Sequence, residues 1–138
     1  MGKKLPKIIR EEEGILMEVP GGGWARRMAA PDGSQKMCMG IVYVERGKAA
    51  HRWHTHDKID RSGKYEIHYP KGFEEGYFIV FGEAVLQWKV NGKIHEEKIR
   101  TGDAVYFPPG VVEHQVLNNS DKPLIIVYAL SPLPKSEK

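Results

Sequence analysis

The sequence predicts an all-β fold of one domain, an antiparallel sandwich or barrel. Short segments rich in β-branched and aromatic residues recur along the chain with an apolar period of two. Turn signals separate these segments at intervals of roughly eight to twelve residues, which is typical of such folds. No segment carries the apolar spacing of an amphipathic helix, so a parallel α/β architecture is not expected.

The residue pattern divides the chain into three parts. Residues 1–36 are expected to form an N-terminal arm with the first turns and a strand, residues 37–130 the barrel, and residues 131–138 a polar tail. Turn signals occur at residues 20–23 and 31–34. Residues 57–74 interrupt the barrel, and we expect them to form a loop or hairpin over its mouth.

Seven strands are expected within the barrel, at residues 37–45, 76–82, 83–90, 93–99, 104–108, 114–118 and 124–130. Asn91 and Gly92 join two of them and form the strongest short hairpin signal, because both residues tolerate positive φ. The last strand is apolar without interruption, which predicts that it is buried on both faces.

Composition narrows the class of protein. The 138 residues suffice for one domain with a sizeable core, and the net charge of +3 is mild and scattered, so nucleic-acid binding is not expected. No apolar run approaches the roughly 20 residues of a membrane span, and no secretory signal is recognisable. The single cysteine, Cys38, cannot form an internal disulfide and lies in an apolar stretch, which predicts a buried structural thiol in a reducing cytoplasm.

Three of the six histidines lie within six consecutive residues, either on a solvated surface or at a metal site. In a strand, His54 and His56 point to the same face, whereas His51 has the opposite parity unless a bulge intervenes. Glu75 opens an apolar strand, where a carboxylate is costly unless it is paired or bound to a metal. His114 begins a later strand and can face the same barrel mouth. These four ligands would offer three nitrogens and one oxygen to one divalent ion.

The same residues resemble the first motif of the cupin family, which has the order glycine, H-x-H, glutamate, glycine. The motif is matched here by Gly47, His54, His56, Glu75 and Gly82. Six residues separate the first glycine from the histidines where the family usually has five, and 18 separate the histidines from the glutamate where it has three or four. Glu74 is an alternative to Glu75, which we prefer because it leaves six residues before the last glycine.

A second cupin motif follows, matched by Gly102, Pro108, Gly110, His114 and Asn118, with one residue more than usual before the histidine. The resemblance covers about residues 37–130 and implies a jelly-roll β-barrel. It implies one divalent transition metal, Fe, Mn, Ni or Zn, held by His54, His56, Glu75 and His114. Asn118 is expected to orient a ligand or to satisfy a buried backbone group.

The resemblance also implies a small metalloenzyme, of the dioxygenase, isomerase, decarboxylase or lyase class, that acts on a small oxygenated molecule. Tyr77, or His51 or His68 from the rim, would then move a proton. The competing interpretations are a packed aromatic ring for Tyr77 and solvent exposure for His51 and Arg52.

Other functions stay open at this point. The protein can instead be a noncatalytic module that binds or senses a small ligand or a metal, whereas the intact ligand set argues against a metal-free sugar-nucleotide isomerase. Cupins of this size often pair through an N-terminal strand, so the resemblance implies a homodimer.

Overall fold

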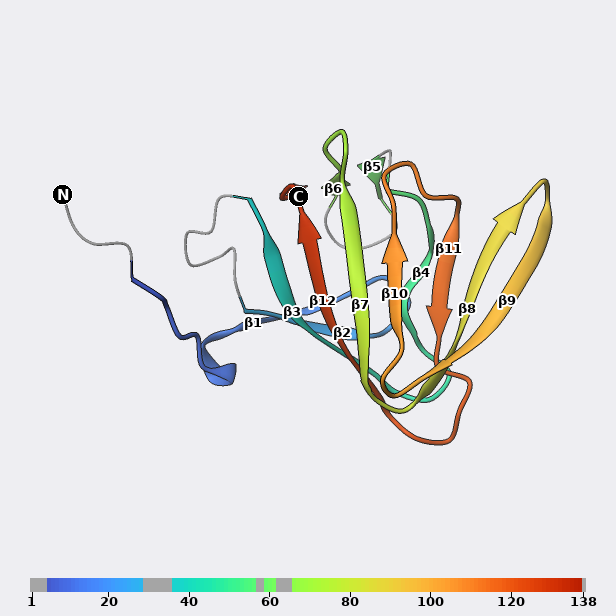
Figure 1. Ribbon diagram of the computed structural model, residues 1–138, viewed down its shortest axis with the longest axis horizontal. Coiled ribbons are helices and arrows are strands. Elements are labelled where there is room, and N and C mark those ends of the chain that lie inside the picture. The colour runs from blue at the N-terminus through green and yellow to red at the C-terminus, as the bar shows by residue number, and fades with distance from the viewer. Residues whose placement is uncertain (1–4, 29–35, 57–58, 62–65, 138) are drawn as a thin grey trace.

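The computed structural model describes residues 5–28, 36–56, 59–61 and 66–137. Two antiparallel sheets face each other, and a third, small sheet lies at one end of them (Figure 1). The larger sheet runs in the order β1 (Ile15–Glu18), β2 (Trp24–Arg27), β3 (Cys38–Val44), β12 (Leu124–Ser131), β7 (Glu74–Phe81), β10 (Ala104–Phe107). The second sheet runs β4 (Ala49–His54), β11 (His114–Leu117), β8 (Glu83–Val90), β9 (Lys93–Arg100). The small sheet runs β13 (Lys135–Glu137), β6 (Glu66–His68), β5 (Ile59–Asp60).

This architecture confirms the predicted all-β jelly-roll barrel. Each of the seven strands expected in the barrel is present, with bounds that shift by one or two residues. The described residues contain no α-helix, only a 3-10 turn, η1 (Glu11–Glu13), and none of their helices is long and apolar enough to cross a membrane.

The core lies between the two large sheets, whose inner faces both contribute buried side chains. On β3 these are alternate residues, including Cys38, whose predicted burial is confirmed. On β12, Ile126 is buried while Ala129 is exposed, so the prediction that this strand is buried on both faces is wrong. The outer face of the larger sheet is only partly covered within one chain.

Two turns follow the sequence signals closely. Asn91 and Gly92 have φ of 50° and 78°, and the hairpin they form pairs β8 with β9 over eight residues of each strand. Gly21 and Gly22, with φ of 110° and 92°, close the β1–β2 hairpin at the expected turn of residues 20–23. The turn expected at residues 31–34 lies outside the described residues.

Both ends of the chain are more structured than the sequence pattern indicates. The β1–β2 hairpin continues the larger sheet beyond β3, and the polar tail adds β13 to the edge of β6. The described part of the 57–74 insertion forms the antiparallel β5–β6 pair. The small sheet therefore joins the insertion to the C-terminal segment at the end of the barrel where β4 ends and β7 begins (Figure 1).

Candidate metal centre

Strand ends bring the candidate ligands to one end of the barrel. His54 is the last residue of β4 and His114 the first of β11, and the two residues are paired in register. Glu75 is the second residue of β7, in the facing sheet. His56 lies two residues beyond the end of β4. Residues far apart in the sequence thus meet because their strands begin and end at the same level.

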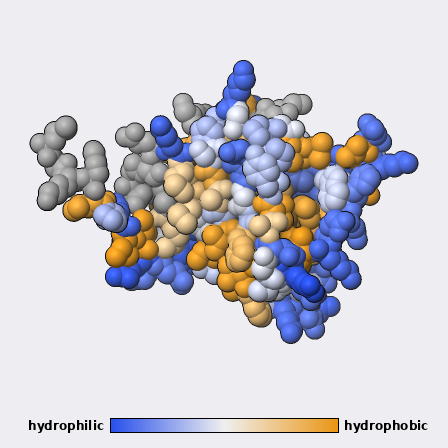
Figure 2. Space-filling model, in the orientation of Figure 1, coloured by the Kyte–Doolittle hydropathy of each residue, from blue (hydrophilic) through white to orange (hydrophobic). Residues whose placement is uncertain are grey.

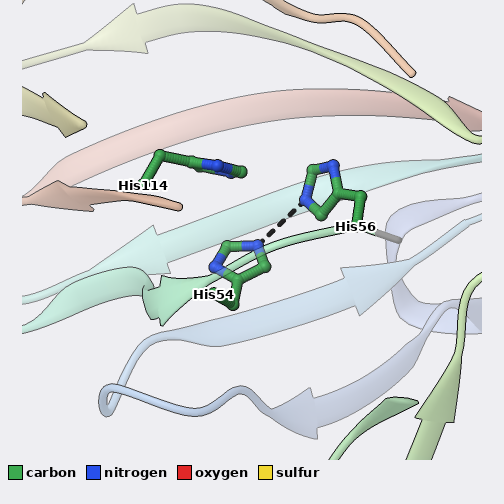
Figure 3. A group of neighbouring side chains, drawn as sticks. All are labelled: His54, His56 and His114. Carbon is green, nitrogen blue, oxygen red and sulfur yellow. Dashed lines mark hydrogen bonds between the residues drawn. The ribbon is translucent and has the colours of Figure 1, made fainter. Parts of the chain in front are cut away.

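The three imidazoles converge (Figure 3). One ring nitrogen from each of His54, His56 and His114 lies within 4.8 Å of the others, and all three side chains are buried. The Nε2 atoms of His54 and His56 are 2.9 Å apart. This group of nitrogens could hold a metal ion.

Backbone carbonyls fix the tautomers of two of these rings. Nδ1 of His54 donates to the Arg52 carbonyl oxygen at 2.7 Å, and Nδ1 of His114 donates to that of Val112 at 2.9 Å. A carbonyl only accepts hydrogen bonds, so in the neutral rings Nε2 is left with a lone pair, as a metal ligand requires. Nδ1 of His56 is buried and has no partner among the described residues. The donor set fits a cation better than it fits a closed hydrogen-bond network.

The electrostatics of the cluster keep the rings neutral. Burial first, and then the neighbouring imidazoles, lower the pKa of His56 to about 3. Burial also lowers the pKa of His114 to about 4 and that of His54 well below 6.5. Neutral imidazoles at pH 7 need no deprotonation to bind a cation.

Glu75, and not Glu74, faces the cluster. Its Oε1 lies 3.6 Å from Nε2 of His56, which is too long for a hydrogen bond, and its side chain is only 12% exposed. Burial raises the pKa of Glu75 to about 8. Glu74 is exposed and accepts a hydrogen bond from the Tyr106 hydroxyl at 2.7 Å. The buried carboxyl group of Glu75 therefore lacks a full partner in the part of the chain that the structure describes, as expected for a group that binds a cation.

His51 lies beside the cluster, and the expectation that it is solvent-exposed is wrong. Its side chain is 11% exposed, its Nε2 lies 2.6 Å from Asp60 of β5, and its ring stacks on His54 with a centroid separation of 3.6 Å. The cause is a bulge between β4 and β11. It lets His51 and His54 point to the same side, although regular alternation would place them on opposite faces. The expected exposure of Arg52 is confirmed.

A pocket opens next to the cluster. Glu75, His51 and Tyr77 line it, as do two aromatic residues that pack on the His56 ring, Tyr69 at 5.1 Å and Phe73 at 5.0 Å between centroids. Burial raises the pKa of Tyr77 well above 10, so its hydroxyl stays protonated.

Four residues of this site were not predicted from the sequence. Arg27, Tyr69 and Phe73 line the pocket, and Asp60 contacts His51. Asp60, Tyr69 and Phe73 belong to the aperiodic insertion, which carries no signal for their direction. A signal for the direction of Arg27 did exist: it is two residues from the buried Ala25 on β2, and residues two apart on a strand point to the same face.

The remaining histidines stand apart. His68 lies 3.6 Å from Glu66 within β6, and His95 is exposed on β9, where it stacks on Trp88. Tyr65, which belongs to the same 57–74 insertion as His68, lies outside the described residues.

Solved structures with the same fold come from proteins of diverse kinds. A predicted oxalate decarboxylase from Thermotoga maritima is 18% identical, with a TM-score of 0.63 over 92% of this chain and all 100% of that chain. The polyketide cyclase RemF from Streptomyces resistomycificus is 14% identical, with a TM-score of 0.69 over 97% of this chain and 85% of that one. The structure of Drosophila melanogaster CENP-C bound to CAL1 is 15% identical, with a TM-score of 0.62 over 88% of this chain and 82% of that one. At these identities the likeness shows the fold alone, and no curated protein matches the sequence.

A family match supplies the assignment that these structures do not. The cupin domain matches residues 58–130, which is more than half of the chain. The match includes Glu75 and the whole second motif, whereas His54 and His56 precede it, so their place in the cluster comes from the fold. The chain belongs to the cupin family.

Proposed function

We propose that this protein is a metal-dependent enzyme that acts on a small oxygenated molecule, with His54, His56, Glu75 and His114 as ligands of one divalent transition metal. One observation carries the proposal: three buried imidazoles converge opposite a buried carboxyl group, and in two of them the backbone hydrogen bond at Nδ1 leaves the lone pair on Nε2. Three nitrogens and one oxygen suit Fe, Mn, Ni or Zn. The metal would supply a Lewis acid that polarises a substrate oxygen and acidifies an adjacent C–H bond.

The residues beside the ligands would manage protons. His51 lines the pocket, and Asp60 holds its ring in place through the 2.6 Å contact at Nε2. Such an imidazole–carboxylate pair can accept a proton from the substrate. Tyr77 keeps its proton and would act as a hydrogen-bond donor or an acid rather than as a base. The reaction class, dioxygenase, isomerase or lyase, is decided by what binds in the open positions of the metal.

A noncatalytic module is the second candidate. The barrel of CENP-C, in a structure titled for its complex with CAL1, has the same fold. A ligand-sensing or metal-binding module would use the same pocket and the same four ligands without turnover.

Metal content tests the ligand assignment. The wild-type protein, purified and dialysed against a trace-metal mixture, is expected to retain about one transition-metal ion per chain by mass spectrometry. His56→Ala and His114→Ala should weaken binding by on the order of 100-fold or more, because each removes a direct ligand. His95→Ala, on exposed β9, is the matched control and should retain the metal. Full occupancy in the first two variants would refute the assignment.

Turnover separates the two candidates. Metal-dependent oxygen uptake with a substrate would mark a dioxygenase, and anaerobic turnover an isomerase or lyase. Saturable ligand binding by the metal-loaded protein, with no turnover under either condition, would favour the noncatalytic module.

We also propose that the protein is a homodimer. The N-terminal segment carries exposed apolar side chains, including Leu5 and Ile8, and β1 forms an edge of the larger sheet. Apolar residues also gather on the outer face of this sheet, among them Phe78 and Val80 of β7 (Figure 2). A second copy that pairs with the β1 edge would cover this edge and the apolar side chains beside it.

A further inference from the structure

Arg27 places a positive charge inside the pocket. On β2, Trp24 is exposed and Ala25 is buried against β3, so alternation turns Arg27 to the inner face. Arg27 is among the residues that line the pocket, whereas its neighbour Arg26 lies on the other face and donates to the Glu11 carbonyl oxygen. No other Lys or Arg lines the pocket among the described residues.

Strand register places Arg27 opposite the metal-ligand end of the pocket. Arg27 pairs with Gly40, Gly40 with Tyr128, and Tyr128 with Tyr77, in one row across four strands. Strands lie about 4.8 Å apart, so the row spans roughly 14 Å at the backbone. Glu75 is two residues from Tyr77 on β7. The pocket thus has a cationic end at β2 and the candidate metal end at β7.

Gly40 gives Arg27 access to the pocket interior. A Cβ atom at Gly40 would lie 2.8 Å from the Tyr128 hydroxyl and would overlap the Arg26 carbonyl oxygen. Because that side chain is absent, Arg27 and Tyr128 are neighbours in the row. The guanidinium partly offsets the effect of burial, which raises the pKa of Tyr128. The hydroxyl is neutral, so it does not balance the charge of the guanidinium.

Among the described residues, no carboxylate forms an ion pair with the Arg27 guanidinium. Nε of Arg27 is buried and has no hydrogen-bond partner among the described residues. A guanidinium stays charged, and leaving one of its donors unpaired in a buried site is costly. Glu75, the only acidic residue that lines the pocket among those described, faces the imidazole cluster, with its Oε1 3.6 Å from Nε2 of His56.

We propose that Arg27 binds the carboxylate of the substrate, which is therefore a small organic acid with its metal-binding oxygens at the other end. Only the second part of this proposal, that the substrate also binds a metal, rests on the proposed function. A carboxylate accepts two parallel hydrogen bonds from the guanidinium fork. One cation matches a singly charged carboxylate better than a phosphate dianion, and the walls, which include Phe73 and Leu130, suit an apolar or aromatic body.

Binding of matched acids and amides tests the proposal. Calorimetry would compare benzoate with benzamide, and 3-phenylpropionate with its amide, on metal-loaded protein. Wild type should prefer each acid by about tenfold or more, the scale of a charge-assisted pair. Arg27→Met should abolish the preference, and Arg27→Gln, which keeps length without charge, should do the same if the methionine variant does not fold. Arg26→Met, on the opposite face of the strand, should retain it.

The same titrations on His114→Ala separate this proposal from the metal assignment. Preference for the acid that persists in His114→Ala and vanishes in Arg27→Met supports an arginine-bound carboxylate, whether or not a metal binds the histidines. Preference that vanishes in His114→Ala and persists in Arg27→Met would place the carboxylate on the metal and overturn the proposal. Equal affinity of wild type for acid and amide would overturn it too.

Discussion

The His114 ring is held in place before any ligand arrives. Its Nδ1 donates to the Val112 carbonyl oxygen, and its face stacks on Phe107 with a centroid separation of 4.5 Å. One contact fixes the tautomer and the other fixes the ring plane, so little side-chain entropy remains to be lost on binding. Burial outweighs the opposing effect of the Val112 hydrogen bond on the pKa of His114 and keeps the ring neutral.

The neutral state of His114 predicts acid sensitivity in the metal-free protein. The ring has a pKa of about 4 in the folded chain against 6.5 when exposed. Above pH 6.5 the ring is neutral in both states and contributes no pH dependence. As the pH falls from 6.5 to 4, only the unfolded chain takes up the proton, so folding loses up to roughly 3 kcal/mol.

Urea unfolding in the presence of a chelator measures this loss, with His114→Gln as the comparison. Between pH 7 and pH 4, the unfolding free energy of wild type should fall by about 2–3 kcal/mol more than that of the variant. Comparing the pair cancels the contributions of Glu75 and the other histidines to first order. A difference that stays constant over this range would contradict a buried neutral ring.

Individual side chains were predictable where a local rule fixed their direction. The strand pattern placed Glu75 and His114 at strand starts, and the structure brings them to one end of the barrel with His54, the last residue of β4, a strand that was not among the seven expected. Parity failed for His51, because a bulge changes which residues share a face and leaves no mark in a single sequence. The partner of His51, Asp60, comes from the insertion, where no period exists to follow.

At the scale of elements, Asn118 fastens the connection between β11 and β12 to the barrel. Its fully buried amide donates to the carbonyl oxygens of Val44 and Lys122 and accepts from the backbone and hydroxyl of Ser120. The structure thus favours the backbone-satisfying role over that of a ligand-orienting group. An amide is required, since one group must both donate and accept.

Asn118→Ala should therefore destabilise the fold by about 2–4 kcal/mol, because the buried carbonyl oxygens lose their donors. Metal affinity should change little at a temperature where the variant is folded. Thermal unfolding and metal titration measure the two effects separately, with exposed Asn119→Ala as the control. A variant as stable as wild type would show that water replaces the amide.

A short contact between His51 of β4 and Asp60 of β5 links the β5–β6 hairpin to the barrel. Asp60→Ala should loosen the β5–β6 hairpin, because no residue of β5 or β6 is fully buried. Hydrogen exchange of amides in residues 59–61 and 66–68 should accelerate by about tenfold or more, while β8 and β9 keep their protection. Unchanged exchange would mean that the pairing with β13 alone holds the hairpin.

Long strands were more predictable than short ones. β3, β7 and β8 have periodic patterns over seven or eight residues, and the Asn91–Gly92 turn fixes one pairing. β5 and β13 span two and three residues, too few to show a period, and they form because the chain brings partners to them. Within residues 1–36 the sequence predicted the glycine turn and one strand, but the pairing of β1 with β2, each of four residues, was missed for the same reason.

For the whole molecule, the family was predictable and the activity was not. The barrel follows from hydrophobic alternation and turn chemistry, which any cupin must satisfy. The reaction depends on the few side chains in the pocket, and structures of the same fold include a polyketide cyclase and the CENP-C complex. The position of Arg27 shows how specificity can enter from a strand outside both family motifs.

The assembly is the largest-scale prediction. β1 is an edge strand, and Leu16 on it is 50% exposed. An apolar edge with unpaired backbone groups attracts another strand unless it is covered, and a second copy of the chain supplies that cover through the same edge.

Sedimentation equilibrium should therefore give a mass near twice 15.7 kDa. Leu16→Lys should shift the protein to the monomer, because a charge at the contact would be buried without a partner. Ile94→Lys, at a residue 58% exposed on β9, should leave the dimer intact. A wild-type monomer at a concentration of about 100 μM, well above the dissociation constant of a specific interface, would contradict the prediction.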